Sequence, residues 1–89
     1  MNIEIDKSFL KSLNKLNLPD IKSKIEAILK EIEKAQSLSE IKQIKKLKGY
    51  KNYYRIKSGD YRIGIESIDA KTILLILVSH RKDIYKRFP

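Results

Sequence analysis

The chain has 89 residues, a length that suits one domain and not two. It contains no cysteine, which excludes disulfide bonds, thiolate metal sites and a cysteine nucleophile, and its single histidine excludes a cluster of histidine ligands. No apolar run approaches the roughly 20 residues of a membrane span, and the N-terminus lacks a signal-peptide pattern. We therefore expect one cytoplasmic domain over residues 1–89 that uses no metal and no cofactor and binds no membrane.

The net charge of +9 is unevenly distributed along the chain. Residues 1–40 hold seven lysines and seven carboxylates and are neutral overall. Residues 41–89 hold thirteen lysines and arginines against four acidic residues, so the whole excess lies there. Such asymmetry favours a polyanionic partner, either a nucleic acid or an acidic protein segment. A generally basic surface without a dedicated partner explains the composition about equally well.

The N-terminal part of the chain predicts one strand followed by two helices. Asn2–Ile5 alternates between polar and apolar residues and predicts a strand. Asp6 is a suitable N-cap for a helix whose apolar spacing continues to about Leu16. Pro19 suits the first turn of a second helix, where its missing N–H is not needed. That helix has a balanced polar face and a core-packing apolar face formed by Ile21, Ile25, Ile28, Leu29 and Ile32.

The C-terminal part of the chain is strand-like. Ser37–Leu47 has an apolar residue every three positions, typical of a short helix or an irregular basic connector. Tyr53–Lys57 and Tyr61–Glu66 alternate and predict a hairpin, and the nearly continuous apolar run Thr72–Val78 predicts a strand covered on both faces. A last helical turn spans Lys82–Phe88. The order β-α-α-β-β-β plus this short helix predicts an α+β fold, with two N-terminal helices packed on one face of a small antiparallel sheet.

The predicted hairpin places three cations, Arg55, Lys57 and Arg62, on the face opposite its apolar residues. A two-residue loop at Ser58-Gly59 or at Gly59-Asp60 sets Arg62 across from either Arg55 or Lys57. Like charges directly opposed on a sheet are destabilising. Long side chains splayed into water are one explanation of this pattern, but three cations without an intervening carboxylate favour an anion site.

Further basic and aromatic residues precede the hairpin. Tyr50 and Tyr53 are candidates for stacking on bases, whereas Tyr54 belongs to the predicted core. The basic residues of this segment are expected to contact RNA phosphates without distinguishing the base sequence. They are Lys45, Lys46, Lys48 and Lys51.

A fourth permanent cation, Arg81, follows the apolar strand, between His80 and Lys82, which are further candidates for contacting RNA. If Lys82–Phe88 is helical, Tyr85 lies on the same side as Arg81, where spacing alone favours an aromatic that covers the helix edge over a ligand contact. The sequence has no metal-ligand cluster, glycine-rich phosphate loop or Ser/His/Asp set. RNA cleavage suits such a chain, because RNA supplies its own nucleophile, the ribose 2′-OH.

Four sequence blocks resemble the RelE/ParE toxin superfamily, on its RelE side: Leu47–Gly49, Tyr54–Lys57, Gly59–Ile63 and Val78–Tyr85. The resemblance covers essentially the whole chain. It implies a toxin of a type II toxin–antitoxin system, a metal-independent mRNA endonuclease that acts in the ribosomal A site and that a cognate acidic antitoxin silences. Carried over by position, it implies the catalytic set Arg55, Lys57, Arg62, Arg81 and Tyr85.

The resemblance leaves the general base and the exact activity open. The best-known RelE proteins usually carry lysine where this chain has Arg55, and arginine holds its proton, so the base would be Lys57 or His80. One alternative is a ParE-like gyrase inhibitor, although that branch tends to lack the Lys/Arg/Tyr set. Another is a non-catalytic RNA-binding module, which would need a longer basic terminal helix. A third is an inactive interaction module.

Overall fold

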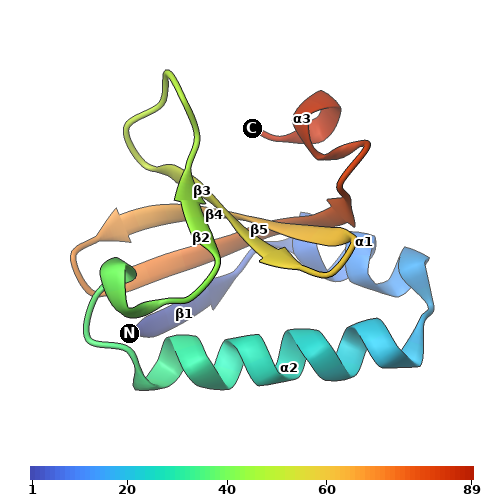
Figure 1. Cartoon of the computed structure of the whole chain (residues 1–89), viewed down its shortest axis with the longest axis horizontal. Coiled ribbons are helices and arrows are strands. Elements are labelled where there is room, and N and C mark those ends of the chain that lie inside the picture. Colours follow the sequence, from blue (N-terminus) through green and yellow to red (C-terminus); the bar gives the residue numbers. More distant parts are fainter.

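The computed structural model describes all residues, 1–89, and contains a five-stranded sheet with helices on both faces (Figure 1). The strand order is β1-β5-β4-β3-β2, and the α+β class is confirmed. None of the helices combines the length and the apolar composition that a membrane crossing requires. In chain order the elements are β1 (Asn2–Ile5), α1 (Lys7–Leu16), α2 (Pro19–Lys34), the 3-10 turn η1 (Leu38–Glu40), β2 (Ile44–Lys46), β3 (Tyr53–Ser58), β4 (Tyr61–Asp69), β5 (Thr72–His80) and α3 (Ile84–Arg87).

The two N-terminal helices begin where the sequence predicts them. The Asp6 carboxylate accepts hydrogen bonds from the Ser8 hydroxyl and from the Ser8 backbone N–H, the latter at 3.0 Å, and these bonds lower the pKa of Asp6. Asn17 adopts the left-handed conformation with φ 46° and ends α1. Pro19 lies in the first turn of α2. Local sequence therefore sets where both helices begin and where α1 ends.

The main core lies between these helices and one face of the sheet. Tyr54 and Tyr61, both half-buried, pack against it, as predicted for Tyr54. An irregularity in the β4–β5 register keeps Leu75 and Val78 on the same face of β5. The eleven buried residues of the main core are Phe9, Ile25, Ile32, Ala35, Ile41, Ile56, Ile63, Ile65, Ile73, Leu75 and Val78.

A smaller core lies on the opposite face of the sheet, beneath α3 (Figure 1). Leu47 and Leu77 pack there against Ile84 and Phe88. The Phe88 ring rests on Gly64, where a Cβ atom would lie 2.8 Å from the ring. Gly64 therefore makes the room that lets α3 pack on the sheet.

The structure corrects two strand predictions. Ile44–Lys46, predicted as part of a short helix or irregular connector, forms the edge strand β2 and pairs with β3. Gln43, with φ 61°, redirects the chain between η1 and this strand. The sheet is also not wholly antiparallel, because β1 pairs in parallel with the free edge of β5. The alternation of Asn2–Ile5 shows which side chains share a face but not the direction of pairing.

The final helix is shorter than predicted. It spans Ile84–Arg87 instead of Lys82–Phe88, and residues 81–83 form turns. In this turn segment the Asp83 N–H donates to the His80 carbonyl at 2.9 Å. The chain therefore leaves β5 through a tight turn before α3 begins.

Candidate functional site

The β-hairpin of β3 and β4 fixes the register of its cations. Ser58 pairs with Tyr61, so the loop is Gly59-Asp60, with Gly59 in the left-handed region at φ 59°. This register places Lys57 directly opposite Arg62, one of the two arrangements that the sequence allowed. Two cations therefore face each other on neighbouring strands.

Side chains on the α3 face of the sheet form two rows across the strands. Neighbouring rows lie about 7 Å apart along a strand, a spacing that long side chains can bridge around one anion. Together, these rows define what we call the cationic face. The first row is Lys57, Arg62 and Ser79, and the second is Lys45, Arg55, Gly64 and Leu77.

Tyr85 joins the cationic face from α3. Its hydroxyl accepts a hydrogen bond from Arg55 Nε at 3.1 Å. The residue is 63% exposed, so its ring is open to solvent beside this hydrogen bond. The expected alignment with Arg81 along one helix is not seen, because α3 begins only at Ile84. The structure instead pairs Tyr85 with the first hairpin cation.

Arg62 is held by the backbone of the hairpin loop. Its Nη1 donates to the carbonyl oxygens of Gly59 at 2.8 Å and of Tyr61 at 3.0 Å. Both acceptors are neutral, so they orient the guanidinium without cancelling its charge. Arg62 thus presents an oriented and uncompensated positive charge.

Arg81 lies at the end of the cationic face and makes the one ion pair in the structure. Its Nε is 3.8 Å from Asp60 Oδ1, and both side chains are more than half exposed. Exposed pairs of this kind are weak, so an incoming phosphate can compete with the carboxylate. The three hairpin cations have no carboxylate partner at all.

His80 lies apart from the first row of the cationic face. It pairs with Tyr61, which packs on the main core, and the two rings meet edge-on with centroids 5.4 Å apart. The backbone N–H of Lys82, an exposed residue, donates a hydrogen bond to His80 Nδ1 at 3.2 Å. Since successive residues of a strand point to opposite faces, the structure does not bring His80 to the row of Lys57 and Arg62.

The predicted phosphate-contacting lysines lie on β2 and in the loop that follows it, and all four are exposed. Lys45 pairs directly with Arg55, which extends the cationic face to the edge of the sheet. Here the surface forms a pocket of about 270 Å³, which we call the basic pocket. It is lined by Lys45, Lys46, Leu47, Lys48, Arg55 and Tyr85.

Sequence reasoning missed Ser79. This residue is only 3% exposed, and its hydroxyl has no hydrogen-bond partner. It stands in one row with Lys57 and Arg62. Its spacing could have placed it on this face, because residues two apart in a strand share a face and Ser79 precedes Arg81 by two.

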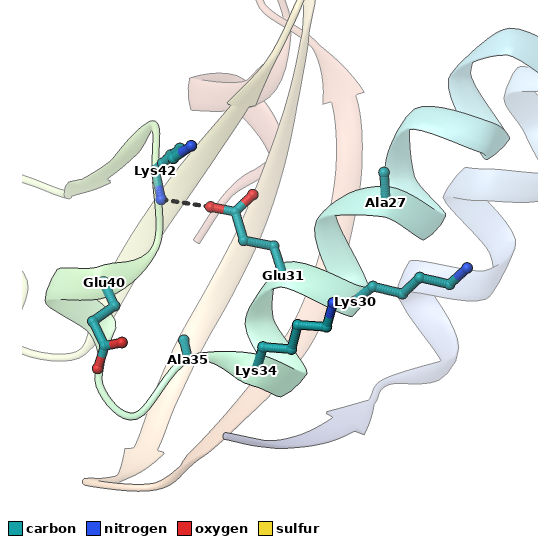
Figure 2. A pocket seen from close by; sticks show the side chains of 7 residues that line it. All are labelled: Ala27, Lys30, Glu31, Lys34, Ala35, Glu40 and Lys42. Atoms are coloured by element: carbon teal, nitrogen blue, oxygen red, sulfur yellow. Dashed lines mark hydrogen bonds between the residues drawn. The ribbon is translucent and has the colours of Figure 1, made fainter.

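The largest pocket, about 450 Å³, lies away from the cationic face, between α2 and the segment around η1 (Figure 2). Glu31 Oε1 accepts a hydrogen bond from the Lys42 N–H at 2.9 Å, and Glu40 Oε2 accepts one from the Gln36 N–H at 3.0 Å. Both carboxylates therefore hold the connection from α2 to β2. No group of three or more acidic or histidine side chains in the structure lies where it could hold a metal ion.

Three comparisons with known proteins all match toxins. Residues 3–85 match the family described as ParE toxin of type II toxin-antitoxin system, parDE. The chain is 45% identical over 91 residues to Toxin RelE3 of Methanocaldococcus jannaschii, with all of both chains covered. It resembles the crystal structure of the RelB-RelE antitoxin-toxin complex from Methanococcus jannaschii with a TM-score of 0.78 and 45% identity, covering 97% of this chain and 99% of that one.

A more distant structure shares the fold. The toxin-antitoxin complex RelBE2 from Mycobacterium tuberculosis matches with a TM-score of 0.61 and 18% identity, covering 90% of this chain and 96% of that one. At this identity the match supports the fold only. The family match and the full-length relative go further: the chain belongs to the ParE toxin family of type II toxin–antitoxin systems and is a RelE-like toxin.

Proposed function

We propose that this toxin is a ribosome-dependent mRNA endonuclease that cuts codons in the ribosomal A site. The observation that carries the proposal is the pair of Lys57 and Arg62, two cations directly opposed with no carboxylate between them. Such a pair costs about 0.2–1 kcal/mol, and a bound phosphate relieves this repulsion. Tyr85 and Arg55 add an oriented hydroxyl beside the same face.

RNA chemistry fits this set of groups. The ribose 2′-OH attacks the adjacent phosphorus, the bond from phosphorus to the 5′-oxygen breaks, and the fragments end in a 2′,3′-cyclic phosphate and a 5′-OH. Arg62 and Arg81 stabilise the negative charge that builds on the phosphate oxygens, because a guanidinium binds two such oxygens at once and stays charged.

Two further groups handle the protons in the proposed reaction. Lys57, acting as a neutral amine, takes the proton of the 2′-OH, since it stands beside Arg62 whereas His80 lies apart from that row. The Tyr85 hydroxyl, held by Arg55, gives a proton to the leaving 5′-oxygen. The exposed lysines of the basic pocket bind the neighbouring phosphates of the strand.

A cognate antitoxin is the partner that the structure with 45% identity supports, since it is an antitoxin-toxin complex. The excess of positive charge in residues 41–89 favours an acidic segment of that antitoxin as the part that covers the cationic face.

A second candidate is a ParE-like gyrase inhibitor, which the description of the matched family favours. The cationic face, with an exposed tyrosine bonded to an arginine, favours RNA cleavage instead. Gyrase trapped on DNA with mRNA left intact would reverse this choice. A non-catalytic module that relies on a long basic terminal helix is disfavoured, because α3 has only four residues.

The test is cleavage of a defined mRNA on programmed ribosomes by the purified toxin. We expect a cut in the A-site codon and a 5′ fragment that ends in a 2′,3′-cyclic phosphate. A 2′-O-methyl group on the ribose at the cut should abolish cleavage, whereas the same group two codons downstream should not. Intact mRNA, or a cut that persists beside the methylated ribose, would contradict the proposal.

A further inference from the structure

An aromatic pocket of about 260 Å³ adjoins the basic pocket, and of its lining residues the proposed reaction uses only Tyr85 and Lys48. The two pockets share Leu47, Lys48 and Tyr85. In Figure 1 the loop between β2 and β3 projects on the same side of the sheet as α3 and the C-terminal end, and these segments supply the pocket walls. The pocket is lined by Leu47, Lys48, Tyr50, Tyr85, Phe88 and Pro89.

Tyr50 is held at this pocket by a series of packed rings. It meets Tyr53 edge-on with centroids 5.6 Å apart, and Tyr53 meets Phe88 edge-on at 5.5 Å. Phe88 in turn is buried against Gly64. The Tyr50 N–H also donates to the Leu47 carbonyl at 3.3 Å. The ring of Tyr50 is therefore anchored to the small core although the residue is 47% exposed.

We propose that the aromatic pocket binds one base of the RNA strand while the basic pocket binds the adjoining phosphate, and that Tyr50 determines which bases are accepted. This inference rests on the proposed function and adds a subsite to it. Every base has a face that stacks on an aromatic ring, and the phosphates that flank it need cations nearby. Lys48 supplies such a cation on the wall that the two pockets share.

Charge favours a nucleotide, with its anionic phosphate, over an apolar side chain of a partner protein as the occupant. No acidic residue lines either pocket, and Lys45, Lys46 and Lys51 are exposed in the same segment as Lys48. An apolar side chain would gain nothing from this concentration of positive charge. In a single-stranded RNA each aromatic base lies next to an anionic phosphate. This arrangement matches an aromatic pocket that adjoins a basic pocket.

The experiment compares single-turnover cleavage of mRNA on programmed ribosomes by the wild type, Tyr50→Ala and Tyr50→Phe. Each protein is tested on a normal A-site codon and on codons with an abasic nucleotide at each position in turn. We expect Tyr50→Ala to lower kcat/KM on normal codons by about 5- to 140-fold, the range for loss of one stacked base, and Tyr50→Phe to retain activity.

The abasic codons distinguish a base contact from a structural effect. At one codon position, removing the base should lower the wild-type rate by the same factor, and Tyr50→Ala should lose nothing further there. Tyr50→Leu, which keeps apolar bulk without a stacking ring, should behave as Tyr50→Ala does. Leu10→Ala, at a position that is 50% exposed on α1, serves as the control and should cleave normally. Thermal unfolding of each variant checks that it is folded.

Several outcomes would overturn the base subsite. If Tyr50→Ala cleaved every codon at the rate of the wild type, the base subsite would be refuted. The proposed function would stand in that case, because the wild type would still cut mRNA. Losses that simply add for Tyr50→Ala and the abasic codons would indicate a structural role. Weaker antitoxin binding by Tyr50→Ala with unchanged cleavage would show that a partner's side chain fills the pocket. Absence of cleavage by the wild type would refute the proposed function itself.

Discussion

The two faces of the sheet differ in what they contribute to this protein. Ile63 and Arg62 are neighbours in β4, yet Ile63 is fully buried in the main core and Arg62 points to the opposite side with an uncompensated charge. The face under α1 and α2 provides most of the apolar burial that stabilises the fold. The face under α3 accepts opposed cations, which a fold would otherwise avoid. A domain of 89 residues can carry such a site because the other face secures its stability.

The α3 face is nevertheless organised and not merely exposed. Its four-residue core fixes α3 through Phe88 and Gly64, and α3 in turn positions Tyr85 beside Arg55. Packing on this face therefore serves the site, whereas packing on the other face serves the fold as a whole. The substitutions that follow separate these two roles.

Ile63→Ala should have the largest effect on stability. It removes a fully buried side chain from the main core and should lower the free energy of unfolding by about 2–5 kcal/mol in urea denaturation. Ile84→Ala is the matched variant for the other face of the sheet, because Ile84 is equally buried but belongs to the small core. An Ile63→Ala protein as stable as the wild type would contradict the division between the two faces.

Gly64→Ala should affect both roles at an intermediate level. The new Cβ would collide with the Phe88 ring, so we expect a loss of about 1–3 kcal/mol in unfolding free energy and slower cleavage as α3 shifts. In the double variant with Phe88→Ala the collision disappears, so the second change should add no cost to Phe88→Ala alone. Full activity and stability in Gly64→Ala would show that α3 does not need this contact.

Lys57→Gln should have the smallest effect on stability, with the opposite sign. Removing one of two opposed cations should raise the free energy of unfolding by about 0.2–1 kcal/mol, while cleavage falls. The gain should shrink in high salt, which screens exposed charges. Lys45→Gln should act in the same direction, since Lys45 is exposed and lies directly opposite a second cation, Arg55. A loss of stability in Lys57→Gln would indicate that these cations do not repel each other.

Much of this division could be predicted from the sequence. Alternation in the hairpin assigned Arg55, Lys57 and Arg62 to one face, because a period of two is preserved in either register. The register itself depends on the loop, and only the structure shows that Gly59-Asp60 is that loop. The two N-terminal helices were predictable because their first-turn residues and apolar faces lie within short segments.

Contacts between distant segments could not be predicted in this way. The three residues Ile44–Lys46 have no strand pattern of their own and become β2 only by pairing with β3. The spacing of Tyr85 pointed to Arg81, whereas the turn after β5 and the Phe88 contact bring it to Arg55. Ser79 went unnoticed because its burial and missing partner are properties of the packed sheet.

Arg62→Ala tests most directly whether the cationic face is the site of RNA cleavage. Single-turnover cleavage of mRNA on programmed ribosomes should be measured together with urea denaturation of the same protein. We predict a cleavage rate about 10²–10³-fold lower, as when one oriented charge-stabilising donor is removed, with no loss of stability. Normal cleavage by folded Arg62→Ala would contradict the assignment of the catalytic site to this face.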